Sequence, residues 1–242
     1  MNARVVAAEL LGTFILVGFG SLTIITAGAS QLPGVLIVPF GFGLALLAGI
    51  AIFGHVSGAH FNPAVTLAAL IDGRISIAGA IAYAVSQFVG GALASLSIMA
   101  LFAREAVDAT RNVPAPQTIN DGQAFAIETV LTAIFIAVIL TTTARRESQA
   151  VFVIPLTLVV IHFAAMLWSG ASVNPARSLG PAIVAGNYEH LWVYLTAPFL
   201  GGLVGWGLYR LMGVFDEGEG AESQGDRGYE EDLLDELEDD RP

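Results

Sequence analysis

The sequence contains no cysteine and no lysine, and only 13% of its residues are charged. The absence of cysteine excludes a disulfide framework, a thiolate metal site and a cysteine nucleophile. All ten basic residues are arginines, so there is no lysine for a Schiff base or a phosphate-binding loop, and no basic patch for a nucleic acid. We therefore expect no metal, no cofactor and no nucleic-acid partner.

The net charge of −11 belongs to the C-terminal end of the chain. Residues 216–242 hold 13 of the 21 acidic residues and two of the ten arginines, so the remaining 215 residues are neutral. A segment of low hydrophobicity and high net charge is typical of disorder. The composition predicts a neutral domain, 1–215, followed by an acidic, disordered tail, 216–242.

The neutral domain consists largely of long apolar stretches. Residues 10–71 contain no Asp, Glu, Lys or Arg, which is enough for two membrane-spanning helices of about 20 residues each. The first predicted span, about 5–27, has an apolar stretch longer than the core of a signal peptide and contains Glu9, so we expect it to remain in the protein. The charge-free stretch at 10–71 and the later ones together predict six spans at about 5–27, 35–53, 79–101, 123–144, 151–168 and 191–213.

The placement of arginines predicts the orientation of these spans. With the N-terminus inside, five arginines fall on the cytoplasmic side and two outside, as the positive-inside rule requires. We therefore expect a multi-pass plasma-membrane protein with both termini in the cytoplasm and a long outer loop at 104–122. The inner arginines are Arg4, Arg74, Arg145, Arg146 and Arg210, and the outer ones are Arg104 and Arg111.

The two halves of the domain repeat each other. The first half, about 1–103, contains AELLGTFILV at 8–17 and SGAHFNPAV at 57–65, and the second, about 123–215, contains AIETVLTAIF at 126–135 and SGASVNPAR at 169–177. Three spans per half is an odd number, so the second copy enters the membrane from the opposite face. The sequence predicts an all-α membrane protein with an inverted 3+3 repeat. Its two short apolar pieces, 62–70 and 174–184, cannot cross a bilayer and are expected to be re-entrant half-helices that meet near the midplane.

Each half-helix begins with an Asn-Pro-Ala motif. Proline at the first helical position has no N–H to leave unsatisfied and a φ that suits the helix start. The preceding asparagine then lies at the helix N-terminus, where the backbone can hold its amide while N–H donors still face a central axis. Two facing positive helix ends would also repel a cation. The motifs are Asn62-Pro63-Ala64 and Asn174-Pro175-Ala176.

The residues ahead of each asparagine are extended and rich in glycine and alanine. Irregular backbone at membrane depth is tolerable only where it is buried or lines a wet cavity. Its carbonyls would then offer acceptors to a neutral solute that both donates and accepts hydrogen bonds. We expect such pore-lining carbonyls at Gly58, Ala59, His60, Gly170, Ser172 and Val173.

The paired motifs, each preceded by Ser-Gly-Ala, resemble those of the aquaporin (major intrinsic protein) family over residues 1–215. The resemblance implies a tetramer with one pore per subunit and an outer constriction typical of the water-selective branch. Ser178 is consistent with that branch, whereas Leu195 after Tyr194 is commoner in relatives that conduct solutes. The constriction would consist of Phe42, His162, Ala171 and Arg177. An imidazole and a guanidinium opposite an aromatic ring make a narrow polar ring with little apolar surface for a carbon backbone.

Glu9 and Glu128 are carboxylates within apolar spans, which is costly and therefore indicates a role. One role is a proton relay, for which the chain offers few titratable partners. The other is a brace, in which each carboxylate accepts backbone N–H groups from the loop of its own half. The family resemblance favours the brace.

These observations predict a passive water channel that carries out no covalent chemistry and is not an enzyme. Three alternatives remain. The first is a facilitator for a small neutral solute such as glycerol, ammonia or hydrogen peroxide, and the second is an ion- or proton-coupled transporter that uses the two glutamates. The third is a membrane adhesion or scaffold protein with a vestigial pore.

Overall fold

The computed structural model describes residues 2–30, 32–145 and 147–213, and the predicted tail at 216–242 lies outside them. Six helices of the described chain are long and apolar enough to cross a membrane, and two shorter ones begin at the prolines of the Asn-Pro-Ala motifs. The prediction of an all-α fold with six spans and two half-helices is therefore confirmed. The long helices are α1 (Ala3–Ala29), α2 (Gly34–Ser57), α4 (Ile77–Phe102), α6 (Asp121–Arg145), α7 (Glu147–Ala165) and the last span (Leu191–Gly213). The half-helices are α3 (Pro63–Ile71) and α8 (Pro175–Ala185).

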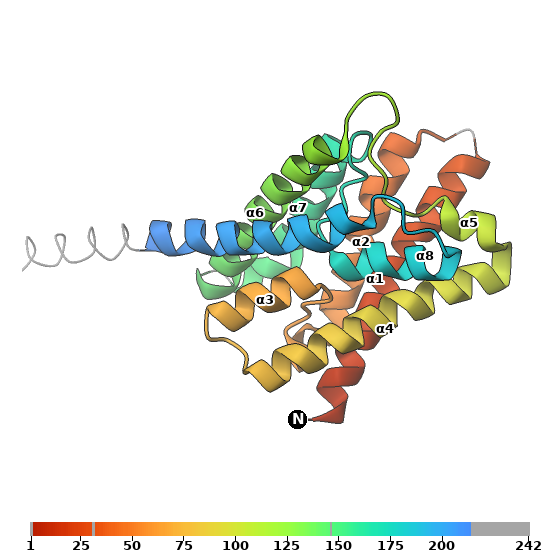
Figure 1. Cartoon of the computed structure of the whole chain (residues 1–242). Coiled ribbons are helices and arrows are strands. Elements are labelled where there is room, and N and C mark those ends of the chain that lie inside the picture. The colour runs from red at the N-terminus through yellow and green to blue at the C-terminus, as the bar shows by residue number, and fades with distance from the viewer. Residues whose placement is uncertain (1, 31, 146, 214–242) are drawn as a thin grey trace, which may run out of the picture.

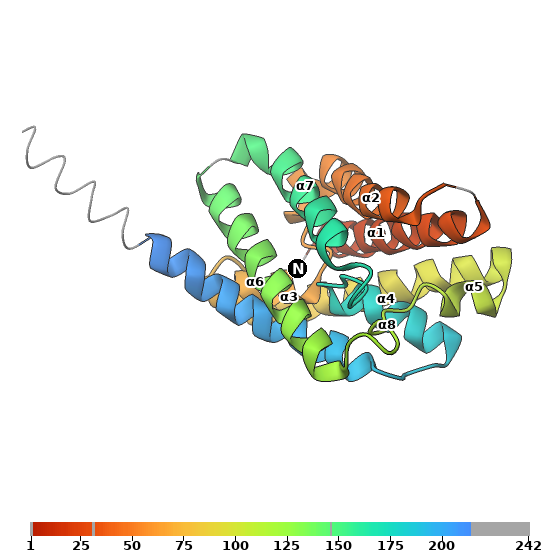
Figure 2. The same ribbon diagram turned by 90° about the horizontal axis from the view of Figure 1, so that it is seen from above.

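The half-helices occupy the middle of the molecule. Figure 1 shows α3 and α8 in line with each other, with α4 running beside both. Seen from above, α1 and α2 lie on one side of this pair while α6 and α7 lie on another (Figure 2). Helices α2 and α7 pack against each other, so the two halves of the chain enclose the ends of α3 and α8.

The outer surface is apolar, as lipid contact requires. Phe19, Phe152 and Val160 are among the large apolar side chains that point away from the protein. In water such a surface would be unfavourable, but lipid tails are as apolar as these side chains and give them no reason to be buried. The helices are therefore held together mainly by close packing and internal polar contacts.

Close packing of the spans follows the same pattern in both halves. A methyl group at Gly90 of α4 would lie 2.4 Å from the carbonyl oxygen of Leu10 in α1. In the second half, one at Gly201 would lie 2.5 Å from the carbonyl oxygen of Thr129 in α6. Glycine is needed at both crossings because any side chain would separate the backbones. The inverted repeat therefore extends from the motifs to the helix contacts.

The outer loop is more ordered than the sequence predicted, because it contains a short helix, α5 (Arg104–Asp108). Arg104 donates hydrogen bonds to the carbonyl of Ala185, the last residue of α8. A cation is favourable at a helix C-terminus, where carbonyl groups lack helical partners. At the other end of the loop, Asn120 and Gln123 cap the start of α6 reciprocally, each side chain accepting from the other residue's N–H at 2.9 Å.

Candidate functional site

The N-termini of α3 and α8 face each other and are joined through the two asparagines. The Asn62 side-chain oxygen accepts from the N–H of Ala64 at 2.9 Å, while its Nδ2 donates to the carbonyl of Val173 in the opposite loop at 2.7 Å. Asn174 accepts from Ala176 at 2.9 Å and donates to the carbonyl of Phe61 at 2.9 Å. Each amide thus caps its own helix and ties down the other loop. The second N–H of each amide remains available to donate a hydrogen bond into the space between the two asparagines.

The loops ahead of the asparagines have unusual backbone angles. Gly58 and Gly170 have φ values of 81° and 83°, and Ala59 and Ala171 have values of 52° and 48°. Each loop has one further left-handed residue, Phe61 in the first and Val173 in the second. For a residue other than glycine this conformation costs roughly 1–2 kcal/mol. It persists only where the surroundings hold it.

The two buried glutamates supply that restraint. Glu9 accepts hydrogen bonds from the hydroxyl of Ser57 (2.6 Å) and from the N–H groups of His60 (3.0 Å) and Phe61 (2.8 Å). Each carboxylate is fully buried, and both reach from the first helix of their half to the loop before the half-helix.

Glu128 repeats this arrangement in the second half. It accepts from the hydroxyl of Ser169 (2.7 Å) and from the N–H groups of Ser172 (2.9 Å) and Val173 (2.8 Å). A tyrosine completes each side: Tyr83 donates to the carbonyl of Ser57 at 2.8 Å, and Tyr194 donates to that of Ser169 at 2.7 Å. The first half adds one further donor to its carboxylate, the amide of Gln87.

A cavity of about 570 Å³ runs past the asparagine pair. One end is bounded by the proposed constriction and the other by His55, Arg74 and Thr143. In the described chain, no aspartate or glutamate lines it, whereas two arginines do. The charged side chains of its described lining are therefore both positive. Five of the six residues with predicted pore-lining carbonyls take part in the lining: Gly58, Ala59, His60, Ser172 and Val173.

Gly170 is not among the described residues that line this cavity. Its carbonyl instead accepts a hydrogen bond from Asn112 of the outer loop at 3.0 Å. Ala171, predicted in the constriction, is fully buried and also lies outside the cavity lining. The structure thus brings together Phe42, His162 and Arg177 but does not place Ala171 at the same surface.

Phe42, His162 and Arg177 form a compact polar group at one end of the cavity. The rings of Phe42 and His162 stack with centroids 4.6 Å apart, and the Arg177 guanidinium carbon lies 4.9 Å from the Phe42 centroid. Nδ1 of His162 lies 2.9 Å from the carbonyl oxygen of Leu158, so Nδ1 carries the proton of the neutral ring. Nε2 is then an acceptor.

Two polar atoms of this group have no partner within the described protein, although both are buried: Nε2 of His162 and Nε of Arg177. Buried polar groups are rarely left without a hydrogen bond. The first is an acceptor and the second a donor, so together they can serve a small molecule that both donates and accepts.

Arg177 is fixed by two residues that the sequence analysis missed. It donates to the carbonyl of Thr110 at 2.8 Å and to the side-chain oxygen of Asn112 at 2.5 Å. The same oxygen of Asn112 accepts from Ser178 at 2.8 Å. No motif marks either residue, because a polar residue in an outer loop is ordinary in a membrane protein.

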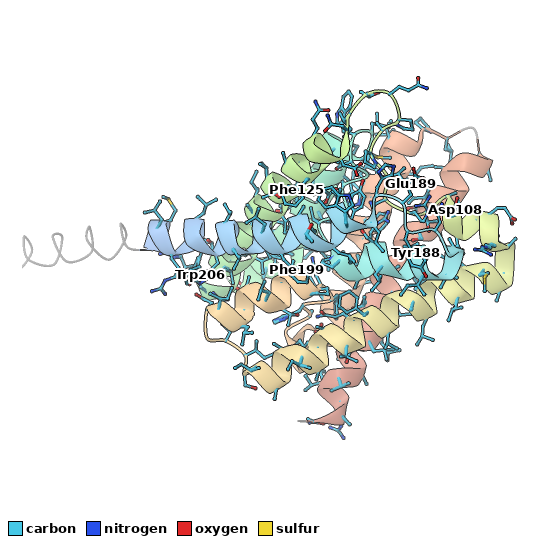
Figure 3. All side chains as sticks on the ribbon, viewed as in Figure 1. Asp108, Phe125, Tyr188, Glu189, Phe199 and Trp206 are labelled. Atoms are coloured by element: carbon cyan, nitrogen blue, oxygen red, sulfur yellow. The ribbon has the colours of Figure 1, made fainter. Side chains whose placement is uncertain are left out.

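The outer loop is tied to the segment after α8 at the end of the molecule where Asp108 and Glu189 lie (Figure 3). Asp108 accepts from Nε of Arg111 at 2.7 Å and from Asn187 at 3.1 Å, and Arg111 also donates to the carbonyl of Glu189 at 3.4 Å. The hydrogen bond from Arg111 lowers the pKa of Asp108, which stays ionised. These contacts position the loop that carries Thr110.

Comparison with known proteins agrees with this architecture. Residues 1–209 match the family model described as Major intrinsic protein. The chain is 40% identical to a glycerol uptake facilitator protein-like 6 from Lactiplantibacillus plantarum, over 86% of this chain and 98% of that protein. It is 39% identical to an aquaporin Z from Photorhabdus laumondii, over 86% and 97%. Among solved structures, the aquaglyceroporin from Plasmodium falciparum superposes with a TM-score of 0.78 at 25% identity, covering 86% of this chain and 95% of that one. The chain belongs to the major intrinsic protein (aquaporin) family, whose members are membrane channels and not enzymes.

Proposed function

We propose that this protein is a passive water channel of the plasma membrane, and that Phe42, His162 and Arg177 form its selectivity filter. The observation that carries the proposal is the pair of unpartnered atoms in this group, one acceptor and one donor. A water molecule can donate to Nε2 of His162 and accept from Nε of Arg177 at the same time. It therefore loses little hydrogen bonding when it leaves bulk water.

Solutes with a carbon backbone enter this filter less favourably than water. The stacked rings leave the face of Phe42 covered by His162 on one side and approached by Arg177 on another. Little apolar surface remains for a carbon backbone, so glycerol would have to give up water contacts without replacement. This is the support for water over glycerol.

Cations are opposed at three levels of the same cavity. Arg177 carries a fixed charge at one end, Arg74 lies at the other, and the N-termini of α3 and α8 point into the middle. Each helix N-terminus carries roughly half a positive charge. An ion would also lose its hydration shell on entry, so water passes and cations do not.

The two glutamates support a channel over an ion-coupled transporter. Every contact of Glu128 named above is with its own loop, and Glu9 has the equivalent contacts plus one from Gln87 of α4. A coupling ion would have to displace donors that hold strained backbone in place. We propose that both carboxylates act as braces.

A small-solute facilitator is the second candidate, because one relative with 40% identity is described as a glycerol uptake facilitator-like protein. Stopped-flow swelling of proteoliposomes separates the two. We expect rapid water flow, no ion requirement, and glycerol entry at the rate of protein-free vesicles. Glycerol entry far above that rate would favour the facilitator, and transport that depends on an ion gradient would favour the transporter. Water flow no faster than in empty vesicles would leave only a scaffold.

A double substitution tests the filter residues directly. Replacing His162 by glycine and Arg177 by valine removes both polar atoms and widens the group. We expect glycerol or urea to enter while the vesicles still swell in water. An unchanged solute profile would show that these positions do not form the filter.

We also propose the arrangement in the membrane. Arg74 and Arg145 would lie in the cytoplasm and Arg104 and Arg111 outside, which puts both termini inside. A homotetramer with one pore per subunit is proposed from the family resemblance. Crosslinking in native membranes tests the assembly, and protease accessibility of sealed cells tests the orientation.

A further inference from the structure

Gln87 is a fully buried amide in the middle of α4 that the water pathway does not contact. Its Nε2 donates to Oε2 of Glu9 at 2.7 Å and to Oγ1 of Thr66 at 2.9 Å. An amide nitrogen has two hydrogens, so both are used by these two bonds. The direction of the second bond is therefore fixed: Thr66 accepts.

This direction determines what Thr66 offers to its other neighbour. Oγ1 of Thr66 lies 3.1 Å from Nδ1 of His60. A hydroxyl oxygen has two acceptor positions and Gln87 occupies one of them, so the hydroxyl hydrogen still needs an acceptor of its own. Among the described residues, Nδ1 of His60 is the atom hydrogen-bonded to Oγ1 that can accept it, and a buried donor without an acceptor is costly. Nδ1 of neutral His60 is then the acceptor, and the ring proton is on Nε2.

We propose that Gln87 is a positioning residue which, acting through Thr66, holds neutral His60 in the tautomer protonated at Nε2, so that His60 donates a hydrogen bond into the cavity. His60 lines the cavity, and Nε2 is the ring nitrogen that remains for it once Nδ1 is bound to Thr66. Tyr83 packs edge-on against the ring with centroids 5.1 Å apart, which restricts its rotation.

His60 and His162 then present opposite hydrogen-bonding groups to the cavity. His162 is protonated at Nδ1 and presents an acceptor at the filter, whereas His60 presents a donor on the other side of the asparagine pair. A water passing the filter is held partly by its hydrogens, and one beside His60 is held by its oxygen.

The second half of the repeat does not reproduce this device. At the positions of His60 and Thr66 it has Ser172 and Ser178, whose hydroxyls lie 2.5 Å apart. Ser178 also donates to the side chain of Asn112, and Ser172 donates to the carbonyl of Asn174, so neither bonds to an amide in the last span among the described contacts. The donor is therefore built by the first half alone, and its effect on transport rests on the proposed function.

Nitrogen NMR tests the tautomers without any transport measurement. The full-length protein is labelled with ¹⁵N-histidine, reconstituted in liposomes and studied at a pH where the imidazoles are neutral. The chain has only four histidines, and His60→Gln and His162→Gln variants assign the two sets of signals. We expect the proton of His60 on Nε2 and that of His162 on Nδ1. A His60 proton on Nδ1 would overturn the proposal whatever the channel conducts.

Variants then test the role of Gln87. Gln87→Leu removes the amide that keeps the Thr66 hydrogen from turning towards α4, so the hydroxyl can rotate and accept from His60. We expect the single His60 pattern to be lost and replaced by a mixture of tautomers or by the Nδ1-protonated form, with His162 unchanged as an internal control. A His60 pattern identical to that of the original protein would refute the assignment.

Substitutions at Thr66 keep the test decisive if Gln87→Leu does not fold. Thr66→Val removes the hydroxyl with little change in volume, and Thr66→Ser retains it. We expect Thr66→Val to change the His60 signals and Thr66→Ser to keep them. A purely structural role of Thr66 would not separate these variants by tautomer, so equal spectra would also refute the relay.

Discussion

The position of the filter arginine depends on one outer-loop side chain, Asn112. Asn112 accepts from Arg177 at 2.5 Å and from Ser178 at 2.8 Å, and it donates to the carbonyl of Gly170 at 3.0 Å. A hydrogen bond to a charged group contributes about 1.5–3 kcal/mol and a neutral one about 0.5–1.5 kcal/mol. Asn112→Ala removes one of the first kind and two of the second. We therefore expect the free energy of unfolding to fall by about 2.5–6 kcal/mol.

The consequence for selectivity follows from the charged bond alone. After the substitution, the carbonyl of Thr110 is the one hydrogen-bond partner of the guanidinium that remains among the described residues. A loss of about 1.5–3 kcal/mol raises the population of alternative Arg177 conformers roughly 10- to 150-fold. A displaced guanidinium opens the space beside Phe42. Stopped-flow swelling should show a higher ratio of glycerol to water permeability.

A matched variant separates this effect from a general loosening of the loop. Asn112→Asp keeps an acceptor for Arg177 but loses the donor to Gly170. We expect it to be less stable than the original protein and yet to exclude glycerol. The reasoning would be refuted if Asn112→Ala kept the original permeability ratio, or if Asn112→Asp leaked glycerol as readily as Asn112→Ala.

Further predictions concern the brace, the helix packing and the outer loop. Glu128→Gln replaces a carboxylate that accepts three hydrogen bonds, so thermal unfolding should show a loss of more than about 3 kcal/mol, and an unchanged melting temperature would contradict the brace. Gly180→Ala places a methyl group 2.5 Å from a backbone oxygen of α4 and should destabilise the protein by about 1–3 kcal/mol. Gly207→Ala places its methyl group where no atom lies within 4 Å, so it should be neutral or stabilising. Equal melting temperatures of the two variants would contradict the packing. The lowered pKa of Asp108 means that its bond to Arg111 stabilises the loop above the ordinary carboxyl pKa and is lost as the pH falls through the lowered one. Hydrogen exchange of the outer loop should therefore accelerate on acidification from about pH 6 to about pH 3, and Asp108→Asn should remove that dependence.

Much of the architecture could be predicted because it depends on local composition. A helix in lipid must satisfy its own backbone and present apolar side chains, so the six spans are visible as charge-free stretches. Proline after asparagine marks the start of each half-helix, and the structure indeed has Asn62 and Asn174 as N-caps. The repeated Glu9 and Glu128 predicted two equivalent braces. Each carboxylate accepts hydrogen bonds from one serine hydroxyl and two backbone N–H groups at equivalent positions, and Glu9 accepts one more from Gln87.

The features that the sequence did not predict are contacts between distant segments. Gly170 has the same local sequence pattern as Gly58, yet its carbonyl is taken by Asn112, 58 residues earlier in the chain. The short helix α5 forms where Arg104 meets the end of α8, a contact over 81 residues. Sequence patterns report the preferences of a segment and of its repeat, but not which loop will lie beside it.

The sequence by itself thus determined that this is a membrane channel of six spans with two facing half-helices, because hydrophobic length, charge placement and repeated motifs are local properties that lipid selects. Only the tertiary structure decided which atoms meet in the cavity. It placed the carbonyl of Thr110 and the side chain of Asn112 on Arg177, and it set the direction of the bonds from Gln87 to His60. The physical reason is that a hydrogen bond needs its donor and acceptor within about 3 Å, and in this protein the packing of the two inverted halves brings them that close.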